Sequence, residues 1–148
     1  MLWIALFMSP DTAHCRIGET LDQCKARYGD PINVLESTAL FSKGGIFVST
    51  HFGKGTVDEI SYYRTSVKNP NRRVSPSDAE VQVLLNANAQ DSKWKLQSSY
   101  WQHALWVNRE HGLSAFRTER ALTISISDPA VFQTYHERKA AARTLQGF

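Results

Sequence analysis

The stretch from Gly18 to Pro31 requires a short helix with a defined start and a defined end near the beginning of the chain. Thr20 and Gln23 have the spacing of a capping box, in which the Thr hydroxyl accepts a backbone N–H and the Gln side chain bonds back to the cap. Gly29 can adopt the left-handed conformation that ends a helix, and the proline two residues later keeps the helix from resuming. The chain must therefore change structure at this point.

One face of the expected helix is apolar. Leu21, Cys24 and Tyr28 lie at i, i+3 and i+7, and so fall along one side. A helix of about ten residues is not stable alone. We therefore expect the segments that follow to cover this face.

The pattern after Pro31 is that of antiparallel strands. Apolar and polar residues alternate, and glycine-containing turns at 43–45 and 53–55 interrupt them. We expect strands at 32–36, 39–41, 46–52 and 57–64.

A polar segment with two prolines, residues 67–76, predicts a linker. Ser77 and Glu80 then form a second capping box, followed by Val81, Leu84 and Leu85 at helical spacing. The remaining elements that we expect are strands at 94–97, 100–108, 113–118 and 121–127, and a helix from Asp128-Pro129 to about Gln146.

The sequence thus predicts an α+β protein of two similar helix-plus-antiparallel-meander units with a C-terminal helix. The alternative is a single α+β sheet that carries two helices. The predicted segments are a truncated signal peptide (1–15), a first unit (16–66), the linker (67–76) and a second unit that includes the C-terminal helix (77–148).

The N-terminus indicates export. Residues 2–8 are an apolar run, too short to span a bilayer, and Ala13-x-Cys15 has the form of a signal-peptidase site. We expect a truncated or misassigned signal peptide, a mature start at Arg16, and a periplasmic or secreted bacterial protein. The alternative is an N-terminal strand or buried tail. If cleavage spares Cys15, an oxidising compartment allows a Cys15–Cys24 disulfide.

The sequence offers no enzyme motif, so we expect no enzyme, cofactor or metal. The five histidines lack the spacing of metal ligands, although His103 and His111 flank an expected hairpin. Cys24 lies early in a helix, where a thiol pKa can fall. An enzyme or redox sensor that uses Cys24 or a histidine pair is the first alternative function.

Nucleic-acid binding is the second alternative. Residues 64–73 contain basic side chains and no acid, next to two tyrosines, and aromatic and basic groups together hold single-stranded nucleic acid. The motif aromatics of common RNA-binding domains are missing, and a basic linker is usually solvated. The basic residues are Arg64, Lys68, Arg72 and Arg73.

Aromatic residues favour a protein partner instead. Tyr62 and Tyr63 are adjacent, as are Tyr100 and Trp101. Adjacent residues of a strand point to opposite faces, so each pair should send one aromatic ring outward. Exposed Trp and Tyr are typical anchors of protein interfaces. We therefore predict that the outward aromatic of each pair contributes to one partner-binding patch, for which Tyr62, Tyr63, Tyr100 and Trp101 are the candidates.

The first half of the chain resembles short exported bacterial proteins and, more distantly, the SmpA/OmlA outer-membrane lipoproteins and the β-lactamase-inhibitor-protein fold. The resemblance implies a non-enzymatic envelope scaffold that binds other proteins through its sheet. The chain departs from the lipoproteins in lacking a lipobox and in showing one helix before the strands. The motifs that carry the resemblance are Gly18-x-Thr20-x-x-Gln23, Tyr28-Gly29-x-Pro31 and Gly55-x-Val57-x-x-Ile60-x-Tyr62.

Overall fold

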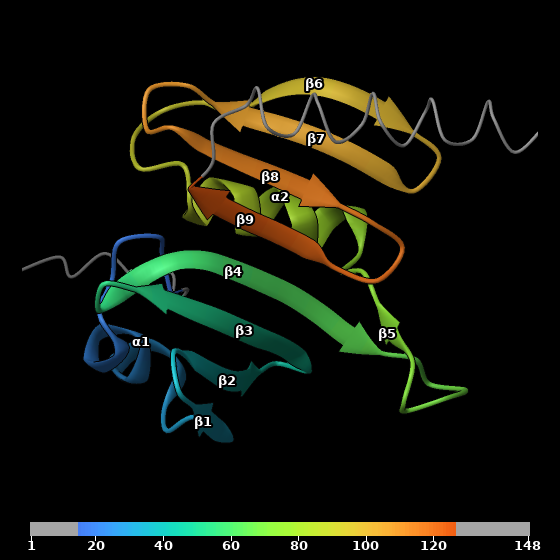
Figure 1. Ribbon diagram of the computed structural model, residues 1–148. Helices are drawn as coiled ribbons and strands as arrows, with labels where there is room; N and C mark the ends of the chain where they lie inside the picture. The colour runs from blue at the N-terminus through green and yellow to red at the C-terminus, as the bar shows by residue number, and fades with distance from the viewer. Residues whose placement is uncertain (1–14, 127–148) are drawn as a thin grey trace, which may run out of the picture.

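The computed structural model describes residues 15–126, in which nine strands form one antiparallel sheet and two short helices pack against it (Figure 1). No helix in this range is long and apolar enough to cross a membrane. The elements are α1 (Leu21–Tyr28), β1 (Asn33–Leu35), β2 (Thr38–Lys43), β3 (Ile46–Gly53), β4 (Thr56–Thr65), β5 (Arg73–Val74), α2 (Asp78–Ala87), β6 (Lys95–Tyr100), β7 (His103–Asn108), β8 (Leu113–Arg117) and β9 (Leu122–Ile126).

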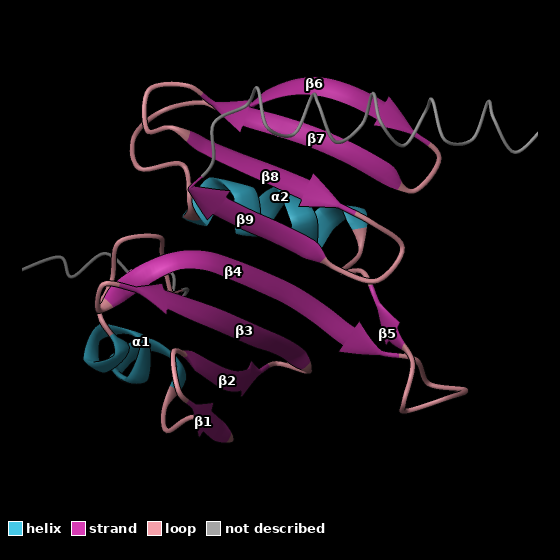
Figure 2. Cartoon of the chain, in the orientation of Figure 1, coloured by secondary structure: helices cyan, strands magenta, loops and turns pink. Residues whose placement is uncertain are grey.

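The strand order is β1-β2-β3-β4-β9-β8-β7-β6, with the short β5 also paired to β4. Every pairing is antiparallel. Strands β4 and β9 join the two halves of the chain through the pairs Glu59↔Ser125 to Tyr62↔Leu122. This leaves β1 and β6 as the two edges of the sheet (Figure 2).

The predicted fold class, two similar helix-plus-meander units with a C-terminal helix, is wrong. The described chain is mostly antiparallel sheet with two short helices, a β-rich fold. The β4–β9 pairing makes one sheet of all the strands, and a single buried cluster contains residues from both halves. The predicted C-terminal helix, from Asp128 onward, lies outside the described residues.

Helix α1 begins and ends where the sequence predicts. Thr20 is the N-cap, and its hydroxyl accepts from the backbone N–H of Gln23 while the Gln23 side chain accepts from the N–H of Thr20. Gly29 ends the helix at φ 83°, and its N–H donates to the carbonyl of Lys25 over 2.8 Å. Local capping and a residue that tolerates positive φ are thus sufficient to delimit this helix.

Helix α2 confirms the second capping box. The Ser77 hydroxyl accepts from the N–H of Glu80, and the Glu80 carboxylate accepts from the N–H of Ser77 over 2.8 Å. The apolar positions predicted from helical spacing, Val81, Leu84 and Leu85, are all buried.

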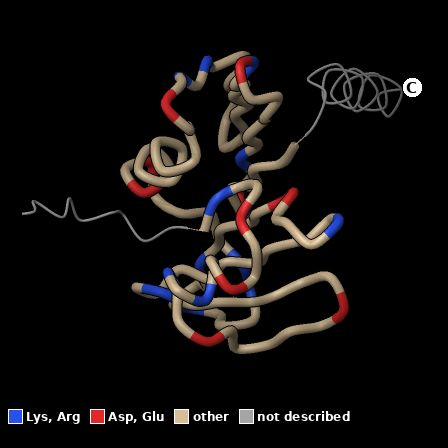
Figure 3. Tube along the Cα trace, turned by 90° about the vertical axis from the view of Figure 1, so that its left-hand side faces the viewer, with Lys and Arg blue, Asp and Glu red and all other residues tan. Residues whose placement is uncertain are grey.

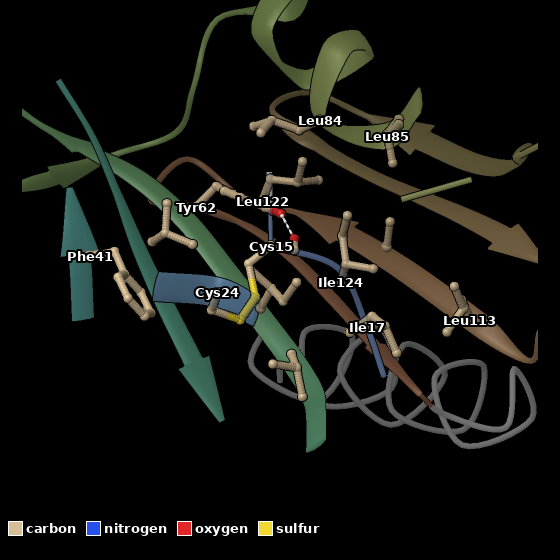
Figure 4. Close-up of a cluster of buried hydrophobic side chains, with 14 of the residues drawn as sticks. Cys15, Ile17, Cys24, Phe41, Tyr62, Leu84, Leu85, Leu113, Leu122 and Ile124 are labelled. Carbon is tan, nitrogen blue, oxygen red and sulfur yellow. Dashed lines mark hydrogen bonds between the residues drawn. A yellow bond between two sulfur atoms is a disulfide. The ribbon is translucent and has the colours of Figure 1, made fainter. Parts of the chain in front are cut away.

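Both helices cover the same face of the sheet. Cys24 of α1 and the buried leucines of α2 belong to one cluster with Ile60 of β4 and Ile124 of β9 (Figure 4). The opposite face carries polar side chains near the centre of the sheet, where the hydroxyls of Ser61 and Thr123 lie 2.8 Å apart. The sheet therefore has one apolar layer beneath the helices and a more polar second face.

A disulfide joins Cys15 to Cys24 inside this core. The segment before α1 is further held by β4, since the N–H of Gly18 donates to the carbonyl of Val57 and the N–H of Val57 donates to that of Glu19. A chain that began at Arg16 would lack this disulfide.

An ion pair fixes α2 to the sheet. The guanidinium of Arg64 on β4 donates through Nε and Nη2 to the carboxylate of Glu80, in the first turn of α2. This bond lowers the pKa of Glu80 from its usual 4.5 to about 2. The charged form is thus favoured in the folded state.

We expect Glu80→Gln to lower the free energy of unfolding by about 1 kcal/mol at neutral pH, a value reduced for the partial exposure of both side chains. A carboxyl whose pKa is depressed on folding stabilises the protein above its unfolded pKa. The wild type should therefore lose this advantage as the pH falls from 4.5 towards 2. Urea denaturation of both proteins across this range measures the difference.

Glutamine keeps the carbonyl oxygen that caps α2, so the variant isolates the charge. A difference between the two proteins that stays constant from neutral pH down to about pH 2 would contradict the assigned ion pair.

Candidate partner-binding site

The structure separates the four aromatic residues that the sequence places in one patch. Tyr62 is 0% exposed and Tyr63 is 6% exposed, whereas Tyr100 and Trp101 are 67% and 88% exposed. The two pairs lie on β4 and at the end of β6, with β9, β8 and β7 between them. At about 4.8 Å per strand the pairs are about 19 Å apart across the sheet. The prediction that each pair contributes one exposed ring to a single patch is therefore wrong for the first pair, because neither Tyr62 nor Tyr63 is exposed.

Tyr62 belongs to the core. Its hydroxyl donates to the carbonyl of Cys15 over 3.2 Å and accepts from the side-chain amide of Asn88 over 3.1 Å. Burial raises the pKa of the Tyr62 phenol well above its usual range, so the hydroxyl remains protonated and able to donate. Tyr62 therefore links three segments of the core and offers no surface to a partner.

Tyr63 points to the opposite face, as the alternation of a strand requires, but it is covered there. Its ring stacks on Phe47 of β3, with centroids 5.4 Å apart and planes at 15°. The guanidinium of Arg73 lies over the same ring, 4.2 Å from its centroid. These two neighbours account for the burial of Tyr63.

Tyr100 and Trp101 form an exposed aromatic tip on the β6–β7 hairpin. Tyr100 pairs with His103, so the connection is the two-residue turn Trp101-Gln102. The two rings have centroids 6.3 Å apart. Large aromatic side chains that extend into water at a hairpin end are well placed to enter a pocket on another molecule.

Trp101 has a backbone conformation that disfavours tryptophan. Its φ is +55°, a left-handed value. Two-residue hairpin turns usually place glycine, asparagine or aspartate at such positions. For other L-residues the left-handed conformation costs about 1–2 kcal/mol. A bulky residue kept at a strained, exposed position is more typical of a functional contact than of a structural one.

A groove of about 700 Å³ adjoins this tip. Its wall includes Trp101 and Arg117, whose guanidinium donates to the carboxylate of Asp78 at 2.5 Å and to the carbonyl of Pro76 at 2.9 Å. Arg72 and Glu119 also line the groove, which thus carries both signs of charge. The arrangement fits a polar partner surface beside the aromatic tip.

Strand β6 provides a further accessible element. Among residues 15–126 it is an edge strand, all six of its residues are exposed, and the exposed Leu96 lies at an irregularity in its pairing with β7. A free strand edge presents unpaired backbone groups to which a partner can add. The tip, the groove and β6 together are called the hairpin site below.

Sequence reasoning missed a second exposed apolar strip at the opposite edge of the sheet. The sequence predicts a short strand at 32–36 without indicating its exposure, and every residue of β1 is exposed. No residue pattern signals this, because exposure at an edge depends on which strands pair beyond it. The exposed apolar side chains are Ile32, Val34 and Leu35.

The first alternative function, an enzyme or redox sensor that uses Cys24 or a histidine pair, gains no support from the geometry of these residues. Cys24 is bonded to Cys15 and is fully buried. His103 begins β7 and His111 follows its other end, about 17 Å away along the strand. His103 stacks on Phe116, with centroids 6.1 Å apart, and His111 Nε2 lies 2.8 Å from the carbonyl oxygen of Gln90.

One group within residues 15–126 has the composition of a metal site. Cys15, Glu19 and Cys24 bring their ligand atoms within 4.8 Å of one another. However, the two sulfurs are bonded to each other, and the carboxylate of Glu19 is held by Arg27 over 2.7 Å. These groups already satisfy one another, and we propose no metal there.

The basic run at 64–73 is divided by the fold. Arg64 is occupied by Glu80, and Arg73 lies on β5 against Tyr63. Elsewhere in the described chain Lys and Arg positions are interspersed with Asp and Glu (Figure 3). The run is therefore no continuous basic surface, although Arg72 and Arg73 remain close together.

No family model, curated protein or solved structure matches this chain. The resemblance to the SmpA/OmlA lipoproteins and the β-lactamase-inhibitor-protein fold therefore stays a prediction.

Proposed function

We propose that this chain is an exported, non-enzymatic module that binds another protein through the hairpin site. The observation that carries the proposal is the exposed pair Tyr100 and Trp101, with Trp101 at a positive φ. Folding alone does not favour a tryptophan at that position. Binding would bury both rings and so compensate for their exposure in the free protein.

The disulfide supports the exported location. Disulfides persist in the periplasm and outside the cell and are rare in the reducing cytosol. Because Cys15 is one of the bonded residues, we place any signal cleavage before Cys15 and not at Arg16. This revises the expected mature start while keeping the periplasmic or secreted location.

We expect Trp101→Gly to abolish capture of the partner without destabilising the protein. Glycine adopts positive φ without strain, so the free energy of unfolding should stay the same or rise by up to about 1 kcal/mol. The melting temperature should accordingly stay the same or rise. Loss of an aromatic anchor typically costs 2 kcal/mol or more of binding free energy, on the order of a thirtyfold loss of affinity. Pull-down from envelope extract, alongside thermal denaturation, measures both quantities.

Val67→Ser is the matched control, because Val67 is also an exposed apolar side chain in a loop. The proposal requires a protein that wild type and Val67→Ser capture and that Trp101→Gly and Tyr100→Ala both lose. A captured set that is identical for all four proteins overturns the proposal. A fall in the melting temperature of Trp101→Gly would instead assign Trp101 a structural role.

A further inference from the structure

A second pocket lies between two loops at the far end of β4. The loop from Ser66 to Arg72 connects β4 to β5, and a turn at 118–121 connects β8 to β9. Between them is an open cleft of about 580 Å³, whose lining consists of Asn69, Asn71, Arg72, Arg73, Arg120 and Ala121. The lining contains three guanidinium groups, two side-chain amides and no carboxylate. We propose that this pocket binds a phosphate group.

Hydrogen bonds within each loop hold the pocket in shape. In the first loop the N–H of Ser66 donates to the carbonyl of Arg72, and the N–H of Arg72 donates to the carbonyl of Asn69. In the second, the N–H of Thr118 donates to the carbonyl of Ala121 over 2.8 Å, and the Thr118 hydroxyl accepts from the N–H of Arg120. Arg72 and Arg120 therefore extend from closed turns, which lowers the entropy lost on binding a ligand.

Arg73 is positioned by the aromatic pair on the second face of the sheet. Its guanidinium lies on the ring of Tyr63, which in turn stacks on Phe47. A cation–π contact uses the charge of a guanidinium and does not consume its N–H donors. Those groups have the fork geometry that binds two oxygens of one phosphate.

The charges in the pocket are not compensated by neighbouring acids. Ion pairs engage other arginines of the described chain, including Arg64 with Glu80 and Arg117 with Asp78. Neither Arg72 nor Arg73 has an ion-pair partner within residues 15–126. Arg120 approaches Glu119 at 3.7 Å, but both side chains are exposed and such a pair contributes little.

An anion with several oxygens satisfies this arrangement best. Three guanidinium groups that line one pocket repel one another, and a doubly charged ligand reduces that repulsion while it accepts hydrogen bonds from their N–H groups. A phosphate has the charge and the oxygens for this purpose, and the amides of Asn69 and Asn71 can donate to the oxygens that remain. The source of the phosphate can be a small soluble molecule or a lipid headgroup, which share this chemistry.

Calorimetric titration of the full chain with inorganic pyrophosphate, at constant ionic strength in chloride, tests the proposal. We expect saturable binding that weakens about tenfold or more in Arg72→Ser and in Arg120→Ser. Lysine at either position should retain part of the affinity. Arg109→Ser is the matched control, because Arg109 is an exposed arginine in the turn between β7 and β8.

Absence of saturable binding, or an equal loss in Arg109→Ser, overturns the proposal. Vesicles of phosphatidylcholine with and without phosphatidic acid identify the source of the phosphate. Binding of the protein to the acidic vesicles alone, with pyrophosphate as a competitor, indicates a lipid headgroup. Pyrophosphate binding without vesicle binding indicates a soluble phosphate.

A single-stranded oligonucleotide provides the remaining arm. The phosphate proposal is overturned in favour of a nucleic-acid site if the oligonucleotide binds much more tightly than pyrophosphate. This outcome also requires that oligonucleotide binding has a steep salt dependence, which Arg72→Ser and Arg73→Ser abolish. Trp101→Gly should bind pyrophosphate like wild type, because Trp101 lines the groove of the hairpin site and not this pocket, whereas Arg72 lines both.

Discussion

Replacing Cys15 and Cys24 together with alanine is expected to lower the free energy of unfolding by about 3 kcal/mol. The disulfide closes a loop with a sequence separation of nine residues, and restriction of the unfolded chain by a loop of this size accounts for roughly that amount. It also holds the segment before α1 against β4, where the carbonyl of Cys15 accepts from Tyr62. Urea denaturation of the variant and the wild type measures the loss.

Alanine is preferred to serine, because both sulfurs are buried and a hydroxyl there would add the cost of an unpaired polar group. A reductant provides the control. It should destabilise the wild type by a similar amount and leave the double variant unchanged. A wild type whose urea midpoint is the same with and without reductant would contradict a disulfide in the folded protein.

Tyr62→Ala should be the most damaging single substitution among the four predicted aromatic positions, at about 3–5 kcal/mol. The side chain is fully buried among residues of both halves of the chain, so its removal leaves a cavity that the sheet cannot easily close. Tyr62→Phe keeps the ring and removes only the hydroxyl. It should cost about 1–3 kcal/mol, because the carbonyl of Cys15 and the amide of Asn88 each lose a partner.

Tyr100→Ala is the matched control and should change the free energy of unfolding by less than about 0.5 kcal/mol, because Tyr100 is exposed. Chemical denaturation of the three variants separates packing from hydrogen bonding at Tyr62. Equal stability of Tyr62→Ala and Tyr100→Ala would contradict the placement of Tyr62 in the core.

Local structure was largely accessible from the sequence. The capping boxes of Thr20 with Gln23 and of Ser77 with Glu80 mark the true starts of both helices. Alternation and glycine-containing turns indicate most strands of the first half within a few residues. Each of these signals depends on residues a few positions apart, and their interactions form in almost any tertiary setting.

The β6–β7 hairpin shows where local signals fail. The sequence predicts an unbroken strand over 100–108, yet the chain turns at Trp101-Gln102. Neither residue is a turn former, so the turn has no chemical signature. The antiparallel pairing of β6 with β7 imposes it, and Trp101 becomes exposed as a consequence.

The sequence by itself determined where the helices start, which of their faces are apolar and where most strands of the first half lie. Tertiary structure decided that β4 pairs with β9 and unites both halves in one sheet, that Tyr62 and Tyr63 are covered on opposite faces, and that Arg72 and Arg120 line one pocket. The β4–β9 pairing and the shared pocket of Arg72 and Arg120 join residues about fifty or more positions apart. Their cost is the entropy of closing long loops, and their gain depends on the packing of the whole sheet, which no short window of sequence contains.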